Sequence, residues 1–219
     1  PTVALGSQEV QFTKASFTAT SKVPTQAYIQ FGSSKDALTQ QSVASNFATS
    51  HNLTLDQAAL TPGATYYYVV VSKNQQGTTT QTSVQSFTTK GLAVAIGVFD
   101  KNHQPIKNKV VTLHSSPVTA KTDSKGYATF SNVAVGTHHL TYVAGKKSYD
   151  QALAVLNNVQ TVGNTQTAPV QNVSVVYGLT QSSGWWTSRW LILTLLVVVV
   201  AAVVAVTTRS KVRFAAPGG

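Results

Sequence analysis

Short runs of alternating hydrophobic and polar residues fill most of this chain. The segment SFTATSKVPTQAYIQFGSS, residues 16–34, alternates, breaks at Pro24 and alternates again. A period of two places one face of a β-strand inward. Pro- and Gly-containing breaks recur at roughly 8–12 residues, which is typical of sandwiches. The pattern predicts an all-β fold with two tandem Greek-key β-sandwiches, over residues 1–90 and 91–180.

One segment departs from this alternation. Residues 190–208, WLILTLLVVVVAAVVAVTT, contain no charged side chain. About 19 residues at a rise of ~1.5 Å span ~28 Å, close to the hydrocarbon thickness of a bilayer. We therefore expect one C-terminal transmembrane α-helix rather than a buried strand or core helix. The residues expected at its two membrane interfaces are Trp185, Trp186 and Trp190 on one side and Arg209, Lys211 and Arg213 on the other.

The three cations after this span predict which side of the membrane each part occupies. Cytoplasmic flanks are enriched in Lys and Arg, so residues 209–219 are expected to form a short basic cytoplasmic tail. Residues 1–180 are then extracellular, and 181–189 form a juxtamembrane segment. Because residue 1 is Pro rather than Met, we expect a removed secretory leader or a chain that begins further downstream.

Residues 60–70 carry a sequence resemblance. LTPGATYYYVV resembles the turn and following strand of a fibronectin type III domain. Ser86–Thr89 are similar to that family's last strand, and YIQFG at 28–32 is similar to a Tyr-x-x-Tyr-Gly-like strand of its bacterial and phosphatase-associated branch. The resemblance implies that Pro62 and Gly63 form a turn and that the hydroxyl of Tyr66 bonds back to the preceding backbone. The tryptophan expected in an early strand falls at about Ala19, and no Arg-Gly-Asp tripeptide is present.

The second half carries a hairpin pattern at TDSKGYATF, residues 122–130. Asp123 opens the turn, Gly126 supplies a positive φ, and Tyr127 and Phe130 are expected to face inward. With Pro105 and the Val-Gly pair at 135–136, this segment resembles carboxypeptidase regulatory-like (transthyretin-like) sandwiches, and partly the bacterial Ig-like domains of invasins. Such modules are non-catalytic. Two strands, 150–158 and 171–179, are expected around a polar loop at 160–168.

Composition argues against catalysis. Sixteen Lys and Arg face only six Asp and Glu, a net charge of +10, and there is no Cys. Paired-carboxylate catalysis and acidic metal sites need acids that this chain lacks. Nucleophile and phosphate-loop motifs are absent, and Asp100 and Asp123 are expected to cap turns. His138 and His139 are adjacent on a strand, so they are expected to be a surface pair that cannot share a metal. We expect no catalytic residue, cofactor or metal.

The lysines are scattered, with Lys146-Lys147 as the one doublet before the tail. Scattered lysines indicate solvated strands and protected sheet edges. Proteins that bind nucleic acids usually cluster their positive charge, so we expect no nucleic-acid partner. Attraction to anionic cell-wall polymers or to the lipid surface stays open. An intramolecular isopeptide bond from Lys107 or Lys109 to Asn172 is a further hypothesis.

The sequence therefore predicts a single-pass, C-terminally anchored protein of the cell membrane. Its function is expected to be structural or interactive, as an adhesin, a spacer or an accessory subunit of an envelope assembly. Expected partners are the membrane and other envelope proteins or cell-surface polymers. Alternatives are a binding or anchoring subunit for a separate surface hydrolase, and the ectodomain of a sensor.

Overall fold

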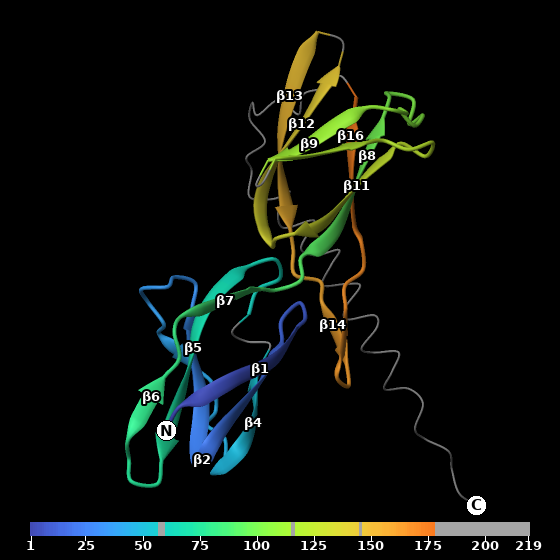
Figure 1. Cartoon of the computed structure of the whole chain (residues 1–219). Coiled ribbons are helices and arrows are strands. Elements are labelled where there is room, and N and C mark those ends of the chain that lie inside the picture. The colour runs from blue at the N-terminus through green and yellow to red at the C-terminus, as the bar shows by residue number, and fades with distance from the viewer. Residues whose placement is uncertain (57–59, 115–116, 145, 178–219) are drawn as a thin grey trace, which may run out of the picture. The chain divides into compact units, whose positions relative to one another are not determined.

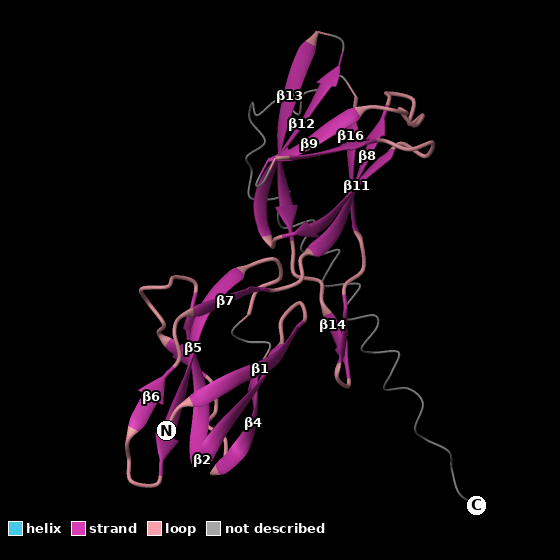
Figure 2. Ribbon diagram, in the orientation of Figure 1, coloured by secondary structure: helices cyan, strands magenta, loops and turns pink. Residues whose placement is uncertain are grey.

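The described part of the chain is built from strands and turns. The computed structural model describes residues 1–56, 60–114, 117–144 and 146–177, and these ranges contain no helix (Figures 1 and 2). No helix in these ranges is therefore long and apolar enough to cross a membrane. The predicted membrane helix at 190–208 and its flanks at 181–189 and 209–219 lie outside the described residues. The described strands belong to one compact unit, Pro1–Gly178.

The first seven strands form one sheet with sandwich-like packing. They are β1 (Val3–Val10), β2 (Ala15–Gly32), β3 (Gln40–Gln41), β4 (Ala48–Leu55), β5 (Thr65–Asn74), β6 (Thr79–Gln81) and β7 (Gln85–Thr88). Their main path is β1-β2-β5-β6; β3 and β4 also pair with β2, and β7 pairs with β5. All of these pairings are antiparallel.

Strand β2 runs without a break through Pro24, where the sequence pattern predicted an interruption. Its first half pairs with β1 and β4, and its second half pairs with β5 and β3. The register with β4 shifts between Thr20 and Thr25. Proline lacks an amide hydrogen, so it fits the stretch where the strand changes partners. The alternation was therefore correct on both sides of Pro24, but it belongs to one strand that serves two sets of neighbours.

The remaining strands form three sheets. They are β8 (Leu92–Phe99), β9 (Val110–His114), β10 (Val118–Lys121), β11 (Tyr127–Val133), β12 (Gly136–Ala144), β13 (Lys147–Val155), β14 (Gln160–Val162), β15 (Thr165–Thr167) and β16 (Gln171–Val176). The orders are β10-β9-β12-β13 and β11-β8-β16, with β14 and β15 as a separate hairpin. Strand β16 runs parallel to β8, with Gln171 opposite Val94 and Val176 opposite Phe99. The sequence analysis predicted a polar loop at 160–168, and this was wrong, because most of the segment forms the β14-β15 hairpin.

The buried hydrophobic residues form two separate clusters. One contains Phe17, Phe31, Tyr66, Tyr68 and Phe87, whose rings contact one another with centroids 4.7–6.3 Å apart. Both halves of β2 contribute to this cluster, which accounts for the buried alternate positions on either side of Pro24. The other cluster lies among β8, β9, β11, β12, β13 and β16 and is mainly aliphatic.

Candidate functional site

The turn before β5 is held by a tyrosine and a threonine. The Thr61 amide donates to the Tyr66 hydroxyl at 2.9 Å, and Gly63 has a φ of +75°. The Thr89 hydroxyl donates to the Thr61 carbonyl at 2.6 Å and accepts from the Ala64 amide at 3.0 Å. Pro62 lies within this turn, and the predicted motif residues Pro62, Gly63 and Tyr66 are thus brought together. The sequence analysis missed Thr89, because a threonine directly after a strand carries no distinctive pattern.

The hairpin at Asp123 is organised by its carboxylate. Asp123 Oδ1 accepts from the amides of Lys125 at 2.8 Å and Tyr127 at 2.9 Å. The bond from the Tyr127 amide is the main reason that the pKa of Asp123 lies below its ordinary value. Asp100 caps its own turn in the same way, with the amides of Asn102 and Gln104 both at 2.8 Å.

One detail of this hairpin corrects the sequence analysis. Phe130 is buried, but Tyr127 lies three positions away and cannot share its face. Ala128 and Phe130 point into the core, whereas Tyr127 is half-buried and packs edge-on against Phe99 at 5.7 Å. The two predicted inward residues therefore lie on opposite faces of β11.

Gly126 and Gly77 allow a matched test of how much room a turn leaves for a side chain. Their φ values are +83° and +85°, but a Cβ at Gly126 would lie 2.9 Å from the Val98 carbonyl oxygen, whereas nothing lies within 4 Å at Gly77. We expect Gly77→Ala to lower the free energy of unfolding by about 1 kcal/mol through backbone strain alone. Gly126→Ala should cost more, about 2 kcal/mol, because the backbone must also shift. Urea denaturation measures both, and equal losses would contradict the role assigned to the Val98 contact.

The histidines do not behave as a surface pair. His138 is buried, and its Nε2 donates to the Ala134 carbonyl at 2.8 Å, which corrects the expectation for this residue. His139 is exposed and its Nδ1 lies 3.0 Å from Asp150 Oδ1. On the neighbouring strand, His114 Nε2 lies 2.8 Å from Thr141 Oγ1. Among the described residues, no group of three or more His, Cys, Asp or Glu is placed to hold a metal.

His51 is a buried histidine, and both of its ring nitrogens lie within hydrogen-bond distance of a hydroxyl. Its Nε2 lies 3.1 Å from Thr25 Oγ1, and its Nδ1 lies 2.8 Å from Ser45 Oγ. Ser45 Oγ also accepts from the Ala27 amide at 3.0 Å. His51 is 3% exposed, and burial lowers the pKa of its imidazole below 6.5. The network joins β4, β2 and the loop after β3, and each of its polar groups serves the fold.

This network predicts acid sensitivity. Because the folded pKa of His51 lies below its unfolded value of 6.5, the unfolded state binds more protons as pH falls. The stabilising contribution is complete above about pH 6.5 and is lost as the pH falls through the lowered folded pKa. We expect the free energy of unfolding to fall more steeply between pH 7.5 and 5 in the native chain than in His51→Gln. Parallel slopes in urea denaturation at each pH would contradict this.

The lysines of the isopeptide hypothesis are placed differently from the expectation. Lys109 Nζ donates to the Tyr177 hydroxyl at 2.9 Å and lies 4.7 Å from the centre of that ring. Asn172 lies on β16 and is exposed, as is Lys107. The amine of Lys109 is thus engaged by a phenol, and within the described residues no hydrogen bond joins it to a side-chain amide.

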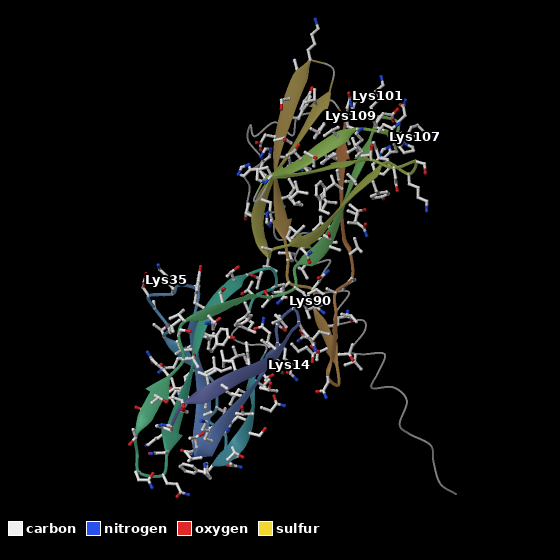
Figure 3. The ribbon with its side chains drawn as sticks, viewed as in Figure 1. Lys14, Lys35, Lys90, Lys101, Lys107 and Lys109 are labelled. Atoms are coloured by element: carbon white, nitrogen blue, oxygen red, sulfur yellow. The ribbon has the colours of Figure 1, made fainter. Side chains whose placement is uncertain are left out.

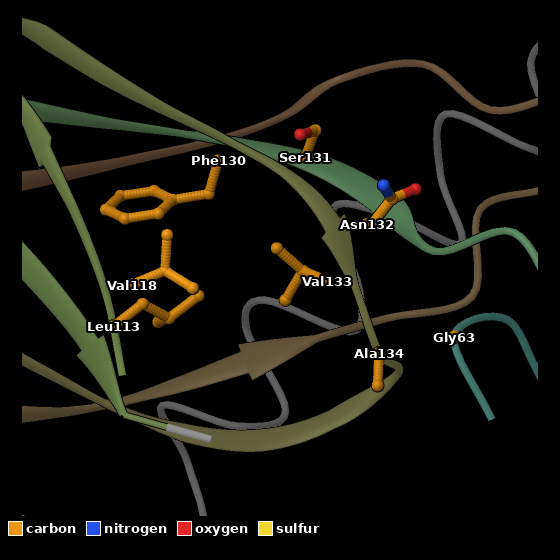
Figure 4. Close-up of a pocket in the computed structure, with 8 residues that line it drawn as sticks. All are labelled: Gly63, Leu113, Val118, Phe130, Ser131, Asn132, Val133 and Ala134. Atoms are coloured by element: carbon orange, nitrogen blue, oxygen red, sulfur yellow. The ribbon is translucent and has the colours of Figure 1, made fainter. Parts of the chain in front are cut away.

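Two concave sites are lined mainly by residues of β9, β10, β11 and β12 and of the loops beside them. One, of about 200 Å³, is lined by Gly63, Leu113, Val118, Phe130, Ser131, Asn132, Val133 and Ala134 (Figure 4). Leu113, Phe130 and Val133 of this lining belong to the core, whereas Val118 is 52% exposed. The volume of the site is below the roughly 300–1,000 Å³ of small-molecule sites. The other is a groove of about 370 Å³ on β9 and β12, lined by Asn108, Lys109, Val110, Thr112, Thr141, Tyr142 and Val143.

Comparison with known proteins gives distant similarity. No family model and no curated protein matches the sequence. Among solved structures, the chain is similar to the Bacillus anthracis TIE protein, with 8% identity, a TM-score of 0.39 and coverage of 80% of this chain and 40% of that one. For the group B streptococcus pilus 2b backbone protein the values are 10%, 0.33, 80% and 96%. For a two-domain fibronectin type-III segment of chicken tenascin they are 11%, 0.24, 70% and 98%. These values do not assign the chain to a family.

Proposed function

We propose that this protein is a single-pass surface protein whose two β-sandwiches, residues 1–90 and 91–180, act as a structural or interaction module. In this proposal, residues 190–208 anchor it in the membrane, and residues 209–219 are cytoplasmic. Its partners are other envelope proteins or cell-surface polymers, and it has no catalytic activity of its own.

The observation that carries the proposal is how the most reactive polar side chains are used. Asp100 and Asp123 accept backbone amides of their own turns, Tyr66 holds the turn before β5, and His51 ties β4 to β2. A catalytic acid, base or nucleophile must instead direct its reactive atom toward a substrate. Here these atoms stabilise loops between strands, which is what a structural module requires.

Labelling of lysines on intact cells tests the membrane topology. A membrane-impermeant amine reagent should modify exposed lysines such as Lys22 and Lys101, and should modify Lys211 only after the cells are permeabilised. Mass spectrometry of the recovered protein identifies which lysines are labelled in intact cells and which in permeabilised cells. Labelling of Lys211 in intact cells, with Lys22 and Lys101 protected, would reverse the proposed orientation.

A separate assay tests the absence of catalysis. The purified chain is expected not to hydrolyse ester, peptide or phosphate substrates above the background of a His114→Ala, Asp123→Ala double variant. These residues are the control because His114 is an exposed imidazole and Asp123 an exposed carboxylate. Activity in the native chain that the double variant lacks would show that the protein is an enzyme.

A further inference from the structure

The strand directions gather lysines that are scattered in the sequence. Strand β8 ends at Phe99, and the loop that follows carries Lys101 and Lys107 before β9 begins at Val110. Strand β10 returns beside β9 and ends with Lys121 directly opposite Val110. The loop after β8 and the turn after β10 are joined by the Asn108 amide, which donates to the Thr122 carbonyl at 2.9 Å. Figure 3 shows Lys101, Lys107 and Lys109 close together at these strand ends.

The other lysines of this half reach the same end. Lys125 lies in the hairpin whose Gly126 carbonyl accepts from the Val98 amide at 2.8 Å, next to the end of β8. Strand β12 runs antiparallel to β9 and therefore ends at the same side, where Lys146 lies in the turn and Lys147 begins the return strand β13. The basic end, as we name it, consists of Lys101, Lys107, Lys109, Lys121, Lys125, Lys146 and Lys147, which are all the lysines between residues 91 and 177.

The nearby carboxylates offset only part of this charge. Asp100 and Asp123 also lie at the basic end and accept backbone amides, so two carboxylates stand there against seven lysines. The third acid of this half, Asp150, lies further along β13 beside His139. Six of the seven lysines are exposed, and Lys109 is half-buried against Tyr177. The summed field of such a cluster attracts polyanions more strongly than scattered lysines do.

The groove on β9 and β12 continues from the basic end. Lys109 and Asn108 line it at the start of β9, and Thr112 and Thr141 provide hydroxyls along it. Val110 and Val143, 45% and 52% exposed, supply apolar surface. A chain that bears both anionic groups and pyranose rings matches this surface, because lysines bind the anions while hydroxyls and aliphatic side chains contact the rings.

We propose that the basic end and this groove bind an acidic polysaccharide. This inference deepens the proposed function and rests on the surface location that it gives the protein. Nucleic acid fits less well, because single-strand binders stack bases on exposed aromatic rings. The tyrosines here are buried or half-buried: Tyr142 stacks on Tyr149 at 5.3 Å, and Tyr177 carries Lys109. A lipid surface would contact the lysine tips and leave the groove empty.

The test uses the full 219-residue chain in a mild non-ionic detergent, with polygalacturonate as the acidic probe and dextran as the neutral one. The variant Lys101→Gln, Lys107→Gln, Lys125→Gln, Lys146→Gln, Lys147→Gln is compared with the matched control Lys14→Gln, Lys22→Gln, Lys35→Gln, Lys73→Gln, Lys90→Gln. Both remove five positive charges from the chain. Biolayer interferometry in about 150 mM salt should show a Kd about tenfold or more weaker for the basic-end variant and less than twofold weaker for the control.

Val143→Lys separates the groove from charge alone. If the groove receives sugar rings, the bulky substitution weakens polygalacturonate binding despite the added positive charge. Stronger binding by Val143→Lys overturns the groove assignment. Equal losses in the two five-lysine variants, binding to dextran as tight as to polygalacturonate, no binding at this salt, or tighter binding to duplex DNA or phosphatidylglycerol vesicles overturn the proposal. Because lysine labelling tests topology separately, failure here with correct labelling rejects only the polysaccharide.

Discussion

Phe17→Ala is expected to lower the free energy of unfolding by about 3–5 kcal/mol. The Phe17 ring is 2% exposed and lies at the centre of the aromatic cluster, 4.7 Å from Tyr68 and 5.4 Å from Phe87 between ring centroids. Removing it leaves a cavity that two rigid rings cannot close by rotation, and it also removes their edge-to-face and tilted contacts.

Phe47→Ala is the matched control, because it deletes the same ring from the same half of the chain. Phe47 is 42% exposed and lies outside both buried clusters, so its loss should change the free energy of unfolding by less than about 1 kcal/mol. Urea denaturation followed by far-UV circular dichroism measures both variants. Similar losses for Phe17→Ala and Phe47→Ala would mean that the ring cluster is not a stabilising core.

Ile96→Ala is expected to cost about 2–5 kcal/mol in the other half. Ile96 is fully buried on β8, the central strand of its sheet, with Ala128 of β11 opposite on one side and Val173 of β16 on the other. A cavity there is bounded by two paired strands, so neighbouring backbone cannot move in to fill it. The expected loss is therefore toward the upper part of this range.

Ile106→Ala removes the same atoms from a half-buried position at the edge of this cluster. Because solvent already reaches that side chain, we expect a loss no more than about half that of Ile96→Ala. The same denaturation experiment compares the two. A larger loss for Ile106→Ala would show that the core centre lies nearer the loop after β8.

The strands could be predicted from the sequence because alternation is a local property. The period of two around Tyr66 places Tyr66 and Tyr68 in the core and leaves Tyr67 half-buried. The turn at Asp123 was also predictable, since its carboxylate and the positive φ of Gly126 act within a few residues. The prediction that Tyr127 and Phe130 both face inward was wrong, because residues three positions apart on a strand lie on opposite faces.

Features that depend on distant partners could not be predicted. His138 is buried on β12, where it lies opposite Leu153 of β13, and no pattern in the His-His pair indicates this. Likewise, the lysines from Lys101 to Lys147 look dispersed in the sequence, and only the alternating directions of β8 to β13 bring them to one end. The β14-β15 hairpin was missed because its strands are only three residues long and mostly polar, with no buried hydrophobic face.

The parallel pairing of β16 with β8 has a consequence for biosynthesis. Strand β8 begins at Leu92, but its neighbour on one side is complete only when Val176 has been made. Until then, the ribosome-bound chain can pair β8 with β11 alone and leaves the other edge of β8 open. Long-range pairing of this kind forms slowly and exposes an apolar strand edge to other chains. A nascent chain stalled before β16 should therefore be a preferred substrate for holding chaperones, and one extended past it should be released.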